Sequence, residues 1–349
     1  MREAGDGASG MKIVVDALGG DVSPAAPVAG AITAARRFPD VTVLLAGPED
    51  VLRAEIARNG ACPSNVEILP ASQSIGMHEP PVQAFREKRD SSIAVGIGQV
   101  AQGKADAFVS AGNTGAVVAA STLRLGLLGG VQRAGIAVPI VALDHSIVII
   151  DAGANIYCKP SHLLQYGLMA TVFAGDVLGL ENPRVGLLNV GEEEGKGTGL
   201  QREAFELLSR APVNFVGNVE ARDIFFGKCD IVVCEGFAGN VLLKTSESVV
   251  AKLMDHLRTQ IKRSLRRKIG FALCRDVFGP IEHYGDYAEY GGAPLLGVNG
   301  VTIVSHGRSN AKAMENAVRE ARSFVRLRVN EKIAASIRQV PLLDKRPDV

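Results

Sequence analysis

A glycine-rich loop that carries a single lysine is the clearest chemical signal in the sequence. Residues 187–199 read LLNVGEEEGKGTG, so Lys196 lies among glycines, after Glu192, Glu193 and Glu194 and just ahead of an expected helix. Such a loop lets an ammonium group reach an anion, and a helix start favours negative charge. We expect Lys196 to contact phosphate or a developing oxyanion, with Glu193 and Glu194 orienting it or capping the following helix. The alternative is a solvated acidic turn.

Four more segments place glycine beside Asn or Asp directly after an apolar run: DALGGD, SAGNTG, DAGAN and CEGFAGN. Their amides Asn113 and Asn240 can donate to an oxyanion or cap a helix. We predict Lys196, Asn240 and Asn113 as catalytic residues. The predicted substrate- and phosphate-binding residues are Asp16, Gly19, Gly20, Asp21, Thr114, Asp151, Asn155, Asn189, Glu193, Gly195, Gly239 and His306. We expect the aspartates in this set to hold the loops in place and not to act as general bases.

Short apolar runs alternate with helix-length amphipathic segments from residue 12 to about residue 330. Runs of Val, Ile and Leu without polar alternation indicate strands buried on both faces, hence a mostly parallel sheet covered by helices. This is a doubly wound α/β fold, in which loops at the carboxyl ends of the strands share one edge. The predicted strands lie within 12–16, 41–47, 66–70, 107–112, 146–153, 184–191, 213–218, 230–236 and 301–305.

Several functional classes lack their usual signals. The segment GEEEGKG has three residues between its first two glycines and Gly197 after the lysine, so it is not a phosphate-binding P-loop. There is no G-x-S-x-G or H-E-x-x-H pattern, and the five cysteines form no C-x-x-C pair. We therefore expect no metal and no cofactor. A net charge of +1, 5% aromatic residues and no Trp disfavour nucleic acid as a partner.

The ends of the chain and its hydropathy suggest a cytoplasmic protein. Residues 1–10, MREAGDGASG, contain no apolar segment and are interpreted as a disordered leader, not a signal peptide. No stretch reaches the roughly 18 apolar residues that a membrane-spanning helix needs.

One segment is strongly basic. Residues 257–275, LRTQIKRSLRRKIGFALCR, carry seven Lys or Arg and no acid, which leaves about −6 for the rest of a chain of net charge +1. Apolar residues recur every fourth position from Leu257 to Leu273, as on an amphipathic helix or hairpin. Such segments bind anionic membranes or acidic proteins, or they form dimers. We predict a protruding helical hairpin at about 245–285, with membrane or carrier-protein contacts at Arg263, Arg266, Arg267, Lys268, Ile269 and Phe271.

Long motifs resemble those of the PlsX-type phosphate acyltransferases of bacterial phospholipid synthesis, in order from Met11 to about residue 325. They are MKIVVDALGGD, EPPVQAFREKRDSS, GKADAFVSAGNTGA, LLNVGEEEGKG, GNVEARDI, GFAGNVLLKT and DYAEYGGAPLLGVNG. The resemblance implies transfer of a long-chain acyl group from acyl–acyl carrier protein to inorganic phosphate. It also implies a homodimer and a fold related to phosphotransacetylase and to isocitrate and isopropylmalate dehydrogenases.

The same resemblance implies partners and boundaries. The acyl phosphate would pass to a membrane glycerol-3-phosphate acyltransferase, so we expect a cytoplasmic enzyme that associates peripherally with the membrane surface. We expect one catalytic domain over 11–330, with 331–349 as a C-terminal tail.

The chemistry suits a site without a catalytic triad. Phosphate is already largely ionised near neutral pH, so it can attack a thioester directly when donors stabilise the oxyanion. One alternative is a covalent mechanism through Cys234 or Cys158. Others are a dehydrogenase of the isocitrate dehydrogenase type and a non-catalytic module that binds acyl chains or membranes.

Overall fold

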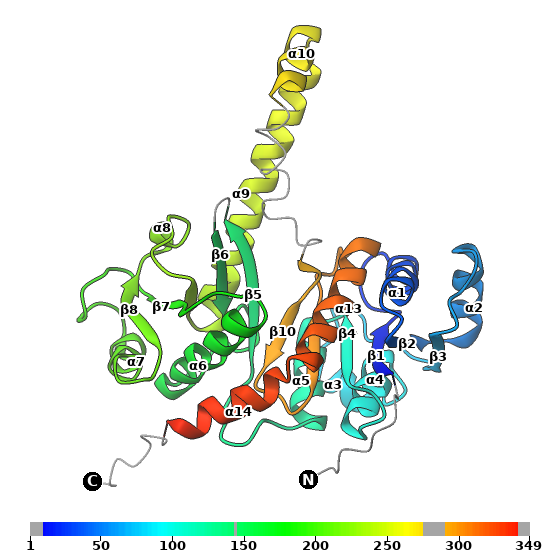
Figure 1. Ribbon diagram of the computed structural model, residues 1–349, viewed down its shortest axis with the longest axis horizontal. Helices are drawn as coiled ribbons and strands as arrows, with labels where there is room; N and C mark the ends of the chain where they lie inside the picture. The colour runs from blue at the N-terminus through cyan, green and yellow to red at the C-terminus, as the bar shows by residue number, and fades with distance from the viewer. Residues whose placement is uncertain (1–9, 143–144, 275–289, 341–349) are drawn as a thin grey trace. The chain divides into compact units, whose positions relative to one another are not determined.

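The structure, a computed structural model, describes residues 10–142, 145–274 and 290–340. The chain divides into two compact units, each built from separate stretches of sequence (Figure 1). Unit 1 comprises Met1–Gly126 and Gly300–Arg326, and unit 2 comprises Leu127–Asn299 and Leu327–Val349. The single catalytic domain expected over 11–330 would span both units, and it stays a prediction.

Unit 1 contains a parallel sheet. Its strand order is β3-β2-β1-β4-β11, and each neighbouring pair is parallel. Ile13, Val14 and Val15 of β1 are fully buried, so both faces of this strand are covered, as the unbroken apolar run predicts. The strands are β1 (Met11–Asp16), β2 (Val41–Gly47), β3 (Val66–Pro70), β4 (Ala107–Ser110) and β11 (Val301–Val304).

Helices pack closely in this unit at positions where glycine, which has no side chain, lets the helix backbone approach its neighbour. A side chain at Gly96 of α4 would lie 2.5 Å from the Phe108 ring of β4, and one at Gly30 of α1 would lie 2.5 Å from Met314 of α13. These close approaches pack α4 onto β4 and α1 onto α13. The helices of unit 1 are α1 (Ala25–Arg37), α2 (Glu49–Arg58), α3 (Pro81–Glu87), α4 (Ser92–Ala101), α5 (Thr114–Arg124) and α13 (Ala311–Arg326).

Unit 2 contains a mixed sheet in the order β10-β5-β6-β9-β7-β8. Strands β6, β9, β7 and β8 are parallel, whereas β5 is antiparallel to both β10 and β6. The carboxyl ends of the four parallel strands therefore lie along one edge. The strands are β5 (Gly135–Ala142), β6 (His145–Ile150), β7 (Arg184–Leu188), β8 (Asn214–Val219), β9 (Ile231–Val233) and β10 (Ala293–Leu296).

The mostly parallel α/β prediction is confirmed, and each predicted apolar run contains a strand. Strand β5 was missed because Pro139 lies inside it, opposite Val148 of β6, and proline usually marks an edge or a break. Strand β10 was also missed.

The helices of unit 2 include a long one that leaves the sheet. Helix α9 (Gly236–Lys262) has 27 residues, about 40 Å at 1.5 Å per residue, and Figure 1 shows α10 (Leu265–Leu273) at its far end. The others are α6 (Pro160–Asp176), α7 (Gly199–Ser209), α8 (Ala221–Ile224) and α14 (Val329–Gln339). The predicted tail boundary at 331 falls inside α14, where Ile333 and Ile337 are buried.

The predicted hairpin is described only in part, because 275–285 lies outside the described residues. Its apolar stripe does not run along one helix: α9 ends at Lys262, and Ser264 caps α10 by accepting from the Arg267 N–H at 3.3 Å. The guanidinium of Arg267 donates to the carbonyl oxygen of Gln260 at 3.1 Å, which holds α10 against the last turn of α9.

Candidate active site

In unit 1 the loops after β1 and β4 close on the buried carboxylate of Asp16. This carboxylate is 1% exposed and accepts from the Ser110 hydroxyl at 2.7 Å and the Leu18 N–H at 3.1 Å. A side chain at Gly19 would lie 2.6 Å from Asp16 and 2.7 Å from the Gly112 nitrogen, so only glycine fits. Burial raises the pKa of Asp16, and its hydrogen bonds oppose that rise. Asp16 thus holds two loops together, and its predicted contact with the substrate stays a prediction.

The loop after β11 joins the same group. The Asp21 N–H donates to the Gly307 carbonyl at 2.7 Å, and Gly20 has a φ of +95° with its backbone close to that same carbonyl. His306 is half-buried beside Gly307, and its Nδ1 accepts from the Arg308 N–H at 3.1 Å. The loops that carry Gly19, Asp21 and His306 therefore meet at one edge of unit 1.

The side chain of Asn113 already makes hydrogen bonds within the protein through both its oxygen and its NH₂ group. Its side-chain oxygen caps α5 by accepting from the Ala116 N–H at 3.1 Å, and its NH₂ group lies within 3.2 Å of the carbonyls of Gly76, Met77 and Glu79. The geometry favours a positioning role that ties α5 to residues 76–79, a contact that the sequence did not predict. Thr114, the next residue, is exposed.

In unit 2 the carboxylate of Asp151 organises the loop after β6. It is fully buried and accepts from five donors, all within 3.1 Å: the N–H groups of Ile136, Gly153, Ala154 and Asn155, and the side-chain amide of Asn155. Burial raises the pKa of Asp151, and these bonds lower it in part. With its acceptor sites in use, Asp151 shapes the loop, and its predicted contact with the substrate stays a prediction.

The Asn155 amide extends the same network. It also donates to the Ala134 carbonyl at 2.6 Å and to the hydroxyl of Tyr166 at 3.0 Å, so Asn155 too acts within the protein.

Two glycines let the start of α9 rest on this loop. A side chain at Gly239 would lie 2.0 Å from the Asp151 carbonyl oxygen, and one at Gly236 would lie 2.6 Å from the Asn155 carbonyl. This approach places the side chain of Asn240 directly beside Gly153. Asn240 is exposed, and its amide has no hydrogen-bond partner among the described residues. It is thus better placed than Asn113 to donate to a ligand.

The first N–H groups of α9 are not open to an anion. The carboxylate of Glu235 accepts from the N–H groups of Phe237 at 2.7 Å and Ala238 at 3.1 Å, and the Gly236 N–H donates to the Asn155 carbonyl. Glu235 is a cap that the sequence did not predict, although it directly precedes the helical run. Any anion near this helix must be held by side chains.

The Lys196 loop has a fixed backbone and a loosely held side chain. The Lys196 N–H donates to the Glu193 carbonyl at 3.0 Å, and the Asn189 amide donates to the Lys196 carbonyl at 3.2 Å. The Asn218 amide secures the Glu193 carbonyl from β8 at 3.0 Å. The Lys196 ammonium lies 3.9 Å from the Glu193 carboxylate, and its side chain is 53% exposed. An ammonium so loosely paired can reach a ligand.

The other acidic residues of the loop differ in their partners. Glu192 pairs with Lys228 at 2.8 Å, while Glu194 and Gly195 are exposed. The following helix, α7, is capped by Thr198 with Gln201, not by the glutamates. Strand β7 pairs directly with β9, so Lys196 and Asn240 come from neighbouring connections at one edge of unit 2.

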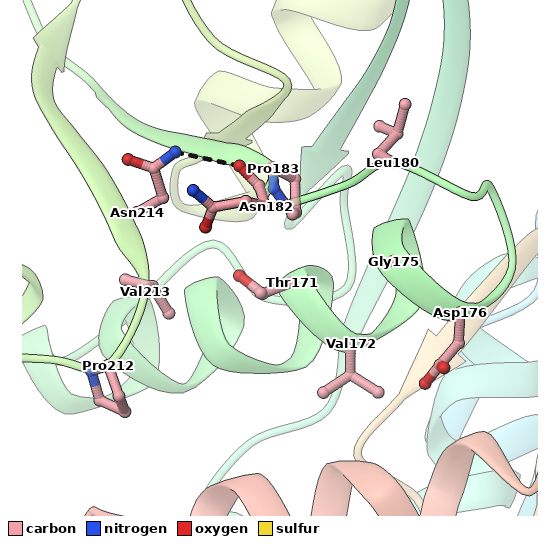
Figure 2. Close-up of a pocket in the computed structure, with 10 residues that line it drawn as sticks. All are labelled: Thr171, Val172, Gly175, Asp176, Leu180, Asn182, Pro183, Pro212, Val213 and Asn214. Atoms are coloured by element: carbon pink, nitrogen blue, oxygen red, sulfur yellow. Dashed lines mark hydrogen bonds between the residues drawn. The ribbon is translucent and has the colours of Figure 1, made fainter.

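A cavity of about 620 Å³ in unit 2 lies apart from these loops. Its lining includes Asn182 and Asn214, which are joined by a 3.0 Å hydrogen bond, and Asp176 of α6 (Figure 2). Asn182 and Asn214 lie at the amino ends of β7 and β8, whereas the candidate site residues follow the carboxyl ends. This cavity is therefore not the predicted site.

Comparison with known proteins gives the family. Residues 11–332 match the family described as "Fatty acid synthesis protein". The chain is 46% identical over 90% of its length to a phosphate acyltransferase of Desulfitobacterium hafniense, covering 94% of that protein. It is 44% identical over 94% of its length to a phosphate acyltransferase of a Geobacter species, covering 93% of that protein. This chain belongs to the phosphate acyltransferase family.

A solved structure supports the fold. A EutD phosphotransacetylase from Staphylococcus aureus aligns with a TM-score of 0.55 at 16% identity, covering 90% of this chain and 95% of that one. The expected phosphotransacetylase-related fold is confirmed, and so is the prediction of an acyltransferase enzyme. Among the described residues, no helix is long and apolar enough to cross a membrane.

Proposed function

We propose that this protein transfers a long-chain acyl group from acyl–acyl carrier protein to inorganic phosphate. Family membership supports acyl transfer to phosphate. The observation that carries the site assignment is the pair of exposed donors, the Lys196 ammonium and the Asn240 amide, on neighbouring connections of unit 2. One is a cation and the other a neutral donor, which suits a phosphate dianion beside a carbonyl that becomes an oxyanion.

The reaction balances without a base or a cofactor. A phosphate oxygen attacks the thioester carbon, the carbonyl becomes an oxyanion, and collapse breaks the carbon–sulfur bond. The thiolate leaves and takes up the proton that the hydrogen phosphate gives up, which yields free carrier protein and acyl phosphate. A thiol pKa of about 8.5 makes this leaving group a good one. Lys196 and Asn240 would stabilise the oxyanion and hold the phosphate.

The direct test is turnover of a defined substrate. Purified protein with palmitoyl–acyl carrier protein and labelled phosphate should form labelled palmitoyl phosphate and release carrier thiol in equal amounts. Release of free palmitate without labelled acyl phosphate would indicate a thioesterase and contradict the proposal.

Two cysteines near the site are poor candidates for a covalent route. Cys234 is 3% exposed, and burial raises its pKa well above that of an ordinary thiol. Burial also raises the pKa of Cys158, which lies near the Tyr166 hydroxyl. Both therefore stay protonated near neutral pH, and a protonated thiol is a weak nucleophile.

We therefore predict that Cys234→Ala retains kcat within about threefold of the parent, because phosphate attacks directly. Rapid quenching with palmitoyl–acyl carrier protein and mass spectrometry should find no acylated cysteine. An acyl adduct on Cys234 or Cys158 that forms and decays at the turnover rate would replace direct attack by a covalent mechanism.

We further propose a homodimer that associates peripherally with the cytoplasmic membrane surface and delivers acyl phosphate to a membrane glycerol-3-phosphate acyltransferase. Helix α10 supports the membrane contact, since it exposes Ile269 and Leu273 beside Arg266, Arg267 and Lys268, while Phe271 is half-buried. Basic amphipathic segments of this type bind anionic lipid surfaces.

Removing two of these charges should weaken membrane binding. Each Lys or Arg near an anionic surface contributes about 1 kcal/mol, so Arg266→Gln with Lys268→Gln should raise the dissociation constant for phosphatidylglycerol vesicles roughly 30-fold. Vesicle co-sedimentation at low salt would measure this. Arg53→Gln with Arg58→Gln on α2 is the matched control, since it removes the same charge elsewhere. Equal losses in the two variants would assign the binding to net charge alone.

A further inference from the structure

A single carbonyl oxygen holds the turn that carries Lys196. The Glu193 carbonyl accepts from the Lys196 N–H and from the side-chain amide of Asn218, both at 3.0 Å. The first bond closes the turn 193–196, and the second fastens this turn to β8. On the other side, the Asn189 amide donates to the Lys196 carbonyl at 3.2 Å. Two asparagine amides therefore fix the backbone on either side of the Lys196 side chain.

The backbone of β8 is irregular directly before Asn218. Its pairing with β7 shifts register between Val185 and Gly186, so that Val216 is an extra residue in β8. The next residue, Gly217, has a φ of +91°, which favours glycine. A bulge changes the face to which the following side chains point, and bulges are frequent next to active sites. This one comes immediately before the amide that reaches the Lys196 loop.

The burial of Asn218 is costly for the folded state. The residue is 3% exposed, and its side-chain oxygen is buried without a hydrogen-bond partner among the described residues. Exchanging the oxygen and nitrogen of the amide would not help, because the Glu193 carbonyl needs a donor. A buried acceptor without a partner destabilises a protein more than one ordinary hydrogen bond stabilises it. Stability alone therefore does not explain an asparagine at this position.

We propose that Asn218 is a positioning residue for acyl transfer, which holds the turn 193–196 so that the Lys196 ammonium meets the reacting groups. This rests on the function proposed above. The ammonium lies 3.9 Å from the Glu193 carboxylate and is loosely paired, so the direction of the side chain depends on its backbone. A shift of about 1 Å at a reacting group can cost 10²-fold in rate. Residues that lower stability while they support a site are common in enzymes.

Asn218→Ala should therefore lower kcat with palmitoyl–acyl carrier protein at least tenfold, at a urea midpoint equal to or above that of the parent. The substitution removes the hydrogen bond together with the unpartnered oxygen. Asn214→Ala is the matched control, since Asn214 lies on the same strand and its amide donates to the Asn182 carbonyl at 3.0 Å, apart from the candidate site. This variant should keep the parent kcat.

Two results of this comparison would overturn the proposal. One is the same kcat in both variants. The other is a urea midpoint for Asn218→Ala well below that of Asn214→Ala, which would attribute the lost turnover to a weakened fold.

A double variant tests whether Asn218 acts through Lys196. If the amide only positions the lysine, adding Asn218→Ala to Lys196→Ala should change kcat by less than about twofold, because the effects of coupled residues do not add. If the two losses instead multiply, Asn218 acts by another route and the proposal is wrong.

Amide hydrogen exchange tests the same role without turnover. The peptide that contains residues 193–197 should exchange about tenfold faster in Asn218→Ala than in the parent or in Asn214→Ala, because the Lys196 N–H loses a fixed acceptor. Unchanged exchange would overturn the positioning role even in an active enzyme. Absence of labelled acyl phosphate from the parent protein would instead defeat the proposed function, and the exchange rates would still show whether Asn218 holds the turn.

Discussion

Replacing Lys196 with alanine should lower kcat by about 10²- to 10³-fold, the usual cost of losing one oxyanion donor. The side chain is half-exposed and its ammonium lies 3.9 Å from Glu193, so little of its charge is used within the protein. The loop backbone is held by hydrogen bonds from Asn189 and Asn218 that the substitution leaves in place. The loss should therefore appear in turnover and leave the free energy of unfolding almost unchanged.

Steady-state kinetics at varied phosphate concentration would show whether the Lys196 charge acts on the transition state or on phosphate binding. A fall in kcat indicates that the ammonium acts on the transition state, whereas a raised KM for phosphate alone indicates ground-state binding. Lys196→Arg should recover little activity, because a planar guanidinium does not replace a compact ammonium in a tight loop.

Lys228→Ala is the matched control for this variant, since its ammonium pairs with Glu192 at 2.8 Å and should be dispensable to within about threefold. Parent-like kinetics for Lys196→Ala would contradict this role and favour the alternative, in which the loop is a solvated acidic turn.

Gly239→Ala should impair both stability and turnover. Its new methyl group would lie 2.0 Å from the Asp151 carbonyl oxygen and 2.9 Å from the Cys234 sulfur, and the first of these atoms belongs to the main chain. Overpacking of this kind costs about 1–3 kcal/mol, and we expect the upper part of that range. Helix α9 must then move away, which displaces Asn240, and a shift of about 1 Å at a reacting group can cost 10²-fold in rate.

Gly98→Ala provides the matched control. Gly98 is also a buried helical glycine, but a side chain there would meet nothing within 4 Å. This variant should be neutral or stabilised by up to about 1 kcal/mol, with parent-like turnover. Urea unfolding and steady-state kinetics of both variants would test the pair. Gly239→Ala with the stability and kcat of Gly98→Ala would show that the close packing on Asp151 is not required.

Local sequence determined the secondary-structure elements of this protein and the residues whose types could take part in its chemistry. The apolar run at residues 41–47 matches β2 to the residue, because burial on both faces leaves little choice of side chain. Residues 66–70 also match β3 to the residue, although this strand is half-buried or exposed. Glycine-rich ends of these runs located the loops, and long motifs in them indicated the family. The lysine at 196 and the amide at 240 could be named as candidates because their types and neighbours suit an oxyanion.

Only the tertiary structure shows which polar groups are already hydrogen-bonded within the protein. Asn113, Asn155 and Asp151 look as suitable for a ligand as Asn240 does, but their hydrogen bonds are taken by the protein. Those partners are carbonyl and N–H groups far apart in the chain or on adjacent turns, and no residue pattern encodes them. Strand β5 was missed for a different reason, because Pro139 lies inside it. Burial and hydrogen bonding belong to the packed chain, so the division between loop-forming and ligand-facing groups appears only when the chain is folded.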